Sequence, residues 1–133
     1  MSYISDKANV YDTAVIGKNV SIGAFAEIGN GVTIGDNVKI GCGAFIPENI
    51  VIQDDVFIGP HVVFTNDKHP PSHGKWREEK PTIIERGSSV GANSTIIPNL
   101  VLGEICRIGA GSVVTRDVKS NSLVYGVPAK ESK

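Results

Sequence analysis

The sequence has no long apolar segment, few cysteines and almost no net charge. No stretch approaches the ~20 apolar residues that a membrane-spanning helix needs. The first residues, MSYISDKANVYDTA, carry charges and do not resemble a secretory signal, so we expect a cytoplasmic protein. Two cysteines are too few for a disulfide framework. A net charge of -1 gives no electrostatic reason to expect binding to nucleic acid or to an anionic membrane.

What the sequence does have is an aliphatic residue at every sixth position. An amphipathic α-helix would instead space its apolar residues by three and four. A short self-similarity of fixed period is typical of a solenoid, here the hexapeptide type of parallel β-helix. The aliphatic positions are Ile4, Val10, Ile16, Ile22, Ile28, Ile34, Ile40, Ile46, Ile52 and Ile58, followed after Phe64 and one interruption by Ile84, Val90, Ile96, Leu102, Ile108 and Val114.

The repeat predicts a three-sided prism in a single domain of residues 1–133. Each hexad forms one short strand and one corner, and three hexads form a coil that stacks on the next at about 4.8 Å. The aliphatic residue and the residue two places before it should point inward, because side chains alternate along a strand. A glycine often follows the aliphatic residue, and we expect it to have positive φ at the corner.

The interruption and the register can both be located. Phe64 and Ile84 lie 20 residues apart, which is 14 more than one hexad, so a loop of about 65–82 should leave the prism at one corner. The three faces are then expected to carry Ile16, Ile22 and Ile28 with their equivalents in later coils. Cys42 and Cys106 fall three coils apart, roughly 14 Å, which is too far for a disulfide. Residues 118–133 leave the period and should fold back along the last coil as a short extension.

Three features could carry function on this scaffold. The loop TNDKHPPSHGKWREEKPT holds two of the three histidines and the single tryptophan, and loops on rigid scaffolds often carry functional residues. The corners Gly91-Ala92 and Gly109-Ala110 are small enough for a long thin ligand to lie against the backbone. The tail SLVYGVPAKESK is the third feature.

The segment GANSTIIPNLVLGEICRIGAGSVVTRDVKSNSLVYGVPAK resembles the C-terminal half of coenzyme A-dependent acetyltransferases of the hexapeptide-repeat superfamily. The resemblance implies an all-β, left-handed parallel β-helix, acetyl-CoA as co-substrate without a metal, and a homotrimer with active sites between subunits. It also implies that the backbone of Ala92 and Ala110 lines the pantetheine, that Arg116 and Lys130 meet coenzyme phosphates, and that residues of the tail lie near the nucleotide. These tail residues are Tyr125, Pro128, Ala129 and Lys130.

The start of the loop resembles two kinds of sugar acetyltransferase. FTND followed by Pro70-Pro71 resembles N-acetyltransferases of nucleotide-linked amino sugars, in which the residue matching Asn66 contacts the sugar amine. The usual tyrosine before the proline is replaced here by His69. The His69-Pro70 pair instead resembles the galactoside and maltose O-acetyltransferases, whose loop histidine is the general base. The acceptor atom, nitrogen or oxygen, therefore stays open.

Acetyl transfer needs a proton acceptor and a group that orients the nucleophile. We assign the base to His69, because imidazole titrates near neutral pH, and the orienting role to Asn66. His61, which should neighbour Asn93, is the alternative base. Asp67 and Trp76 complete the expected substrate site. The plainer interpretations are a solvated His69, a surface His61 on a strand, turn caps at Asn66 and Asp67, and an interface contact for Trp76.

Two further classes of protein remain as alternatives. Some carbonic anhydrases share this prism and bind zinc through three histidines, but His69 and His73 lie in one loop and their spacing does not resemble that pattern. A solenoid with a purely structural role is the other. We predict acetyl transfer from acetyl-CoA to the amine of a nucleotide-linked amino sugar, with sugar O-acetylation as the second candidate.

Overall fold

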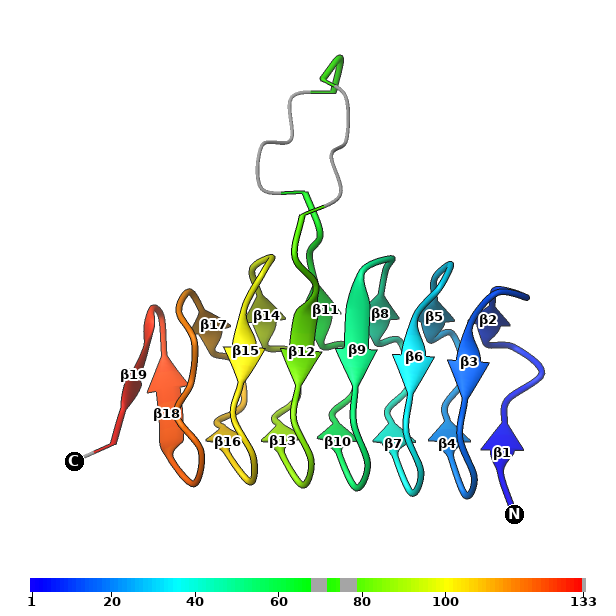
Figure 1. Ribbon diagram of the computed structural model, residues 1–133, viewed down its shortest axis with the longest axis horizontal. Coiled ribbons are helices and arrows are strands. Elements are labelled where there is room, and N and C mark those ends of the chain that lie inside the picture. Colours follow the sequence, from blue (N-terminus) through cyan, green and yellow to red (C-terminus); the bar gives the residue numbers. More distant parts are fainter. Residues whose placement is uncertain (68–71, 75–78, 133) are drawn as a thin grey trace.

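A computed structural model describes residues 1–67, 72–74 and 79–132. The described residues form short strands and turns, and the coils lie side by side along one axis (Figure 1). The described part of the chain contains no helix long and apolar enough to cross a membrane. His69 and Trp76, both assigned to the site from the sequence, lie outside the described residues.

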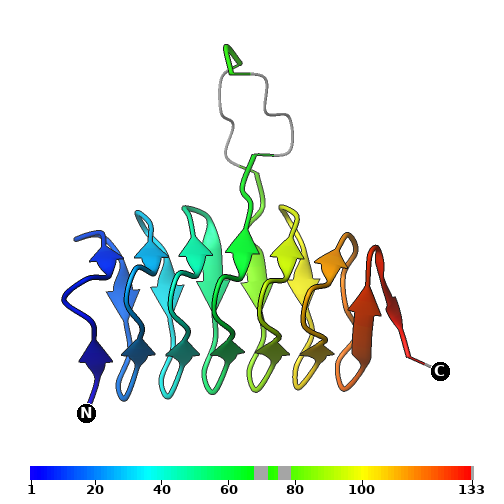
Figure 2. The same ribbon diagram turned by 180° about the vertical axis from the view of Figure 1, so that it is seen from behind.

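The strands form three parallel sheets, which we call faces A, B and C; the same coils are seen from behind in Figure 2. Face A contains β1 (Tyr3–Ile4), β4 (Ser21–Ile22), β7 (Lys39–Ile40), β10 (Phe57–Ile58), β13 (Ser89–Val90), β16 (Arg107–Ile108), β18 (Leu123–Gly126) and β19 (Ala129–Glu131). Face B contains β2 (Asn9–Val10), β5 (Glu27–Ile28), β8 (Phe45–Ile46), β11 (Val63–Phe64), β14 (Thr95–Ile96) and β17 (Val113–Val114). Face C contains β3 (Val15–Ile16), β6 (Thr33–Ile34), β9 (Ile50–Ile52), β12 (Thr82–Ile84) and β15 (Val101–Leu102).

The register confirms the coil length and the assignment of residues to faces. Ile4 pairs with Ile22 and Ile22 pairs with Ile40, so residues 18 apart in the sequence are neighbours in a sheet. The inward positions are also confirmed, because the aliphatic residue and the residue two places earlier are buried in nearly every coil. The first coil is the exception: Ile4 is 43% exposed, and Val10 and Ile16 are only partly buried, since no coil lies beyond them at the N-terminal end.

The expected role of the glycine after the aliphatic residue is wrong. The glycines with positive φ are others, such as Gly31 and Gly43, which stand two positions further on. Gly41 is needed for a different reason: a Cβ placed on it would lie 2.5 Å from the backbone nitrogen of Pro60 in the next coil. Stacked backbones approach each other so closely at these corners that a side chain has no room.

The interruption and the tail follow the sequence prediction. The chain leaves the prism after β11 and returns in β12, which pairs with β9 on one side and β15 on the other, so the sheet continues across the insertion. In the tail, Val118 pairs with Leu102 and Val124 pairs with Ile108, a spacing of 16 residues in place of 18. The chain then folds back, and β19 pairs antiparallel with β18.

The two cysteines are separate, as the register predicts, and occupy different environments. Both are free; Cys42 is exposed at a corner, and Cys106 is buried in the core. The Sγ of Cys106 lies 3.4 Å from the Oγ of Ser88. Burial raises the pKa of the Cys106 thiol, so its reactive thiolate is scarce at neutral pH.

A first prediction concerns the crowded glycines. Gly41→Ala should lower the free energy of unfolding by about 3 kcal/mol, because the new Cβ meets backbone that cannot move independently. Gly31→Ala is the control: its φ is +69° and nothing lies within 4 Å of the added Cβ, so only the backbone cost of about 1 kcal/mol applies. Equal losses in denaturant titrations of the two variants would contradict the crowding explanation.

A second prediction concerns thiol reactivity. A thiol reagent such as dithiobis-nitrobenzoate should modify Cys42 quickly in the native protein and Cys106 only after denaturation. The Cys42→Ser variant should therefore show almost no rapid labelling at pH 7, with the remaining thiol titrating once denaturant is added. Rapid native labelling of Cys42→Ser would show that Cys106 is not enclosed by the prism.

Candidate functional site

The prism has three edges, named here for the faces that they join. In each coil the chain runs from face C over the CA edge to face A, over the AB edge to face B, and over the BC edge back to face C. In one coil, Asn19, Phe25 and Gly31 mark the CA, AB and BC edges, and all three have positive φ. Each candidate residue in the described prism can be placed on one of these edges.

Ala92 and Ala110 lie in successive coils of the AB edge, as the register predicts. The N–H of Gly111 donates to the carbonyl oxygen of Ala92 at 2.8 Å, and a Cβ on Gly91 would lie 2.5 Å from the backbone nitrogen of Ala110. Tyr125 continues the stack, since a Cβ on Gly109 would lie 2.8 Å from the Tyr125 Cβ. We call Ala92, Ala110 and Tyr125 the AB strip; it presents small side chains and backbone, with Tyr125 56% exposed at its end.

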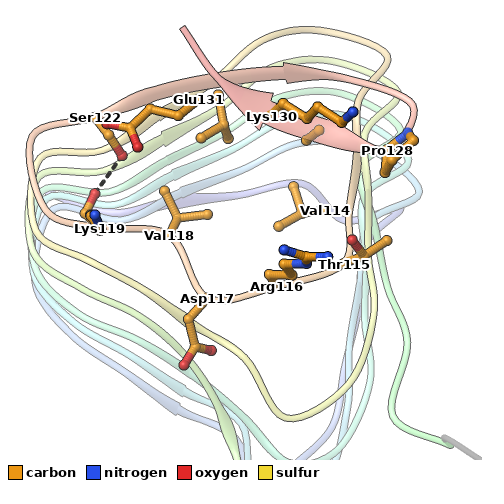
Figure 3. A pocket seen from close by; sticks show the side chains of 12 residues that line it. Val114, Thr115, Arg116, Asp117, Val118, Lys119, Ser122, Pro128, Lys130 and Glu131 are labelled. Carbon is orange, nitrogen blue, oxygen red and sulfur yellow. Dashed lines mark hydrogen bonds between the residues drawn. The ribbon is translucent and has the colours of Figure 1, made fainter. Parts of the chain in front are cut away.

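The C-terminal end of the prism holds a pocket of about 450 Å³. Figure 3 shows Val114 and Val118 toward the middle of this pocket, with Lys130 and Pro128 on the folded-back tail above them. Four of its lining residues were assigned to the coenzyme from the sequence: Arg116, Pro128, Ala129 and Lys130. Tyr125 is not in the lining, but it pairs with Lys130 across the β18–β19 hairpin, so the hairpin joins the AB strip to the pocket.

The pocket is lined by both basic and acidic side chains. Arg116, Lys119 and Lys130 supply positive charge, and Asp117 and Glu131 supply negative charge. The Asp117 carboxylate accepts a hydrogen bond from the backbone N–H of Val101 at 2.8 Å. The ion pair found among the described residues joins Arg86 to Glu104, at 3.5 Å, and neither residue lines the pocket. No described carboxylate therefore forms an ion pair with the pocket cations. Such basic groups can bind phosphate oxygens.

Asn66 and Asp67 lie elsewhere, in a groove of about 460 Å³ at the BC edge. Its lining comes from the coil that ends at Asn66 and from the coils N-terminal to it. Asn66 is half-buried and donates its side-chain amide to the carbonyl oxygen of Glu48 at 3.2 Å. The lining is Tyr11, Glu27, Gly29, Asn30, Phe45, Pro47, Glu48, Asn66 and Asp67. Aromatic rings beside carboxylates and amides suit a polar ligand with an apolar side, such as a sugar.

The sequence interpretation missed both the groove walls and the residues that hold the loop ends. Tyr11, Glu27 and Phe45 come from different coils, and the register could have shown that Glu27 and Phe45 are neighbours on the outside of face B. Asn49 and Asn99 donate their side-chain amides to the carbonyl oxygens of Glu79 and Lys80, which ties the returning chain to coils on either side. The recurrence of asparagine at this corner, in Asn49 and Asn99, was the feature of the sequence that could have predicted these hydrogen bonds.

His61 lies on the AB edge and not on a strand, which corrects the sequence interpretation. Its φ is +57°, and its backbone N–H donates to the carbonyl oxygen of Cys42 at 3.0 Å. The backbone N–H of Asn93 likewise donates to the carbonyl oxygen of Pro60 at 3.0 Å, so Asn93 lies in the coil next to His61, as predicted. The imidazole lies over Gly43, where an added Cβ would be 2.5 Å from Nδ1. His61 is thus one coil from Ala92 and on a different edge from Asn66.

The candidate residues therefore form two groups in one chain. The AB strip, His61 and the C-terminal hairpin make one group, and Asn66 with Asp67 makes the other. Face B separates the two edges, so a single chain does not bring Asn66 next to Ala92. No group of three or more His, Cys, Asp or Glu side chains within the described ranges is arranged to hold a metal ion.

The bacterial transferase hexapeptide family matches the chain at residues 13–48, 31–66 and 81–116. The chain belongs to this family. Its six-residue repeats correspond to the strands and corners described above, and the gap between the matches corresponds to the segment that leaves the prism at the BC edge.

Individual relatives include sugar-modifying enzymes. A dTDP-3-amino-3,6-dideoxy-alpha-D-galactopyranose 3-N-acetyltransferase of Aneurinibacillus thermoaerophilus is 51% identical over 49 residues, which cover 37% of this chain and 26% of that protein. The crystal structure of AntD, an N-acyltransferase from Bacillus cereus in complex with dTDP and 3-hydroxybutyryl-CoA, is similar with a TM-score of 0.89 and 28% identity. That similarity covers 99% of this chain and 79% of AntD.

A GDP-perosamine N-acetyltransferase from Caulobacter crescentus, solved with CoA and GDP-perosamine, is similar with a TM-score of 0.87 and 24% identity. The similarity covers 99% of this chain and 56% of that one, and it confirms the predicted fold class, a left-handed parallel β-helix. The segment matched in the curated relative is about a quarter of that protein's length.

Proposed function

We propose that this chain is an acetyltransferase that moves the acetyl group of acetyl-CoA to the amine of a nucleotide-linked amino sugar. The observation that carries the proposal is the AB strip, a backbone-lined column that ends at the hairpin beside a pocket lined by Arg116, Lys119 and Lys130. This is the shape and charge that coenzyme A requires: a thin pantetheine arm, then a nucleotide with phosphates. Membership of a transferase family and the N-acyltransferases among the relatives support the same activity.

The coenzyme follows the AB strip in this proposal. Its pantetheine runs past Ala92 and Ala110 and exchanges hydrogen bonds with backbone groups, which the small side chains leave accessible. Its nucleotide lies near Tyr125, Pro128 and Ala129. Arg116 and Lys130 then meet the phosphates, because charge-assisted hydrogen bonds to phosphate oxygens are among the stronger polar contacts.

The acceptor sugar occupies the groove at the BC edge. Tyr11 and Phe45 offer apolar surface to the sugar ring, while Glu27 and Glu48 favour an ammonium group over a phosphate near them. Asn66 orients the amine, and Asp67 and Trp76 complete the substrate site. The amine acceptor is favoured over a hydroxyl because these groove carboxylates attract a cation, and because the relatives named above act on amino sugars or are N-acyltransferases.

The chemistry requires one proton acceptor. The neutral amine attacks the thioester carbonyl, the C–N bond forms, the C–S bond breaks, and the proton that leaves nitrogen reaches the departing sulfur. A backbone N–H at a corner of the AB strip stabilises the oxyanion. His69 is the proposed base, and His69→Ala should lower kcat; nearly full turnover would transfer the role to His61, which approaches from the coenzyme side.

The site needs two copies of the chain. Asn66 and the AB strip lie on different edges of one prism, so the acceptor of one subunit meets the coenzyme of the next. A homotrimer with three such sites satisfies this requirement, because a heterologous contact repeated by a threefold axis closes a ring.

Coenzyme binding gives a direct test of the AB strip. Ala110→Phe should raise the Kd for acetyl-CoA by at least about tenfold, because the ring fills the path of the pantetheine. Ala24→Phe is the matched control, since Ala24 occupies the equivalent corner near the N-terminal end. Isothermal titration calorimetry measures both values. If the wild-type protein binds no acetyl-CoA and acetylates no member of a panel of nucleotide amino sugars, the proposed function is wrong.

Subunit complementation tests the shared site. Asn66→Ala and Ala110→Phe homotrimers should each be nearly inactive. Trimers formed from an equal mixture should recover activity, because about a quarter of the sites then combine an intact Asn66 from one subunit with an intact Ala110 from the next. Recovery is measured as acetyl transfer per subunit after co-refolding. A mixture no more active than its two components would place the whole site within one chain.

A further inference from the structure

We propose that Ser94 and Ser112, two buried serines behind the AB strip, are positioning residues for the coenzyme. Their hydroxyls hold the Gly109 carbonyl toward the core and so direct the N–H of Ala110 outward, as a donor to the pantetheine. This inference rests on the proposed function, because it takes from it that the coenzyme follows the AB strip. It adds two residues that do not touch the ligand but determine how tightly the ligand binds.

The core of the prism does not require a hydroxyl at these two positions. Ser94 and Ser112 stand two places before the aliphatic residue of face B, where side chains point inward, and both are 0% exposed. A buried hydroxyl is costly unless it is hydrogen-bonded, so the serines have to be explained by the bonds that they make. They occur in the two coils that carry Ala92 and Ala110. In the earlier coils the same column holds apolar residues, which are Ala8, Ala26, Ala44 and Val62.

Both hydroxyls donate to one carbonyl oxygen, that of Gly109 at the AB edge. The distances to this oxygen are 2.6 Å from the Oγ of Ser112 and 3.1 Å from the Oγ of Ser94. In a coil with an apolar residue in this column, the corresponding carbonyl accepts a longer backbone bond: that of Gly41 accepts from the N–H of Ala44 at 3.3 Å. The two hydroxyls therefore hold the Gly109 peptide more firmly than the turn alone would.

The direction of the Gly109 carbonyl determines the direction of the next N–H. A trans peptide is planar, so the C=O of one residue and the N–H of the following residue point in opposite directions. Because the Gly109 carbonyl faces two buried hydroxyls, the N–H of Ala110 faces away from the core. Within the described residues this N–H donates to no acceptor, and Ala110 is exposed. It is therefore an oriented donor on the AB strip that a carbonyl of the pantetheine can reach.

The two serines also join the AB strip to the C-terminal hairpin. The Oγ of Ser112 accepts a hydrogen bond from the N–H of Gly126 at 3.2 Å, and the Oγ of Ser94 accepts one from the N–H of Ser112 at 3.3 Å. Gly126 belongs to β18 and directly follows Tyr125, the last residue of the AB strip. Each hydroxyl thus donates to Gly109 and accepts from the coil that follows its own, so the pair connects the peptide beside Ala110 to the hairpin.

Ser88 provides the comparison that separates positioning from packing. It lies in the same coil as Ser94 and is equally buried, and its hydroxyl donates to the carbonyl oxygen of Gly103 at 2.8 Å. That carbonyl belongs to the CA edge, which carries no part of the AB strip. In the preceding coil the equivalents of Ser88 and Ser94 are Val56 and Val62, so valine fits both positions. If the serines served only to satisfy corner carbonyls, replacing either one would have the same effect on the coenzyme.

The test measures the Kd for acetyl-CoA by isothermal titration calorimetry. Ser94→Val should raise this Kd about fivefold, because the donor on the AB strip loses its fixed direction. Ser94→Ala, which restores the residue type of earlier coils, should raise it by a similar factor. Ser94→Thr has nearly the shape of the valine variant but keeps the hydroxyl, so it should recover most of the affinity. Ser88→Val is the matched control, and its Kd should equal that of the wild-type protein.

The outcomes separate this inference from the proposed function. If the wild-type protein binds acetyl-CoA and Ser94→Val binds it as tightly, the hydroxyl does not position the strip and the proposed function stands. The same conclusion follows if Ser94→Thr or Ser88→Val loses as much affinity as Ser94→Val, because the loss then comes from altered packing. If the wild-type protein binds no acetyl-CoA, the proposed function is wrong and the positioning role fails with it.

Discussion

The backbone hydrogen bonding between equivalent strands of successive coils is the constraint on which the rest of this structure depends. The N–H of Gly23 donates to the carbonyl of Ile40 at 2.9 Å, and Gly41 donates to Ile58 at 2.8 Å, and the pattern continues along each face. Every coil must therefore repeat the backbone path of its neighbour. The inward aliphatic residue fills the prism, and the residue after it must be small where the backbones approach most closely.

The same constraint creates the functional surfaces. Because residues 18 apart are superimposed, one small residue in each coil becomes a continuous strip, as at Ala92 and Ala110. The segment after Phe64 leaves at a corner, and β12 still pairs with the strands of the coils before and after it. An insertion at a corner thus costs the sheet no hydrogen bonds, and the prism can carry a long loop and a folded-back tail without altering its core.

Much of the fold was predictable because the period is short and regular. The three faces, the inward positions, the site of the interruption and the separation of Cys42 from Cys106 all follow from counting. The prediction that the glycine after the aliphatic residue has positive φ was wrong, because the first and the third residue after the aliphatic were treated as one corner position. Asparagine recurs at the third residue after the aliphatic, as in Asn19, Asn37 and Asn93, and this is the position with positive φ. Asparagine tolerates that conformation, so the sequence already contained the signal.

The sequence by itself determined the three-sided prism, its register and the place of the interruption, since a six-residue period fixes which residues lie over one another. The left-handed twist and the family were expected from the resemblance of the C-terminal segment to acetyltransferases. Only the tertiary structure decided that Tyr11 and Asn66 line one groove with Glu27 and Phe45, and that the folded-back tail joins the AB strip to a basic pocket. These relations depend on the direction in which side chains leave three faces of a prism. A one-dimensional period places residues in columns, but it does not say which columns a ligand spans.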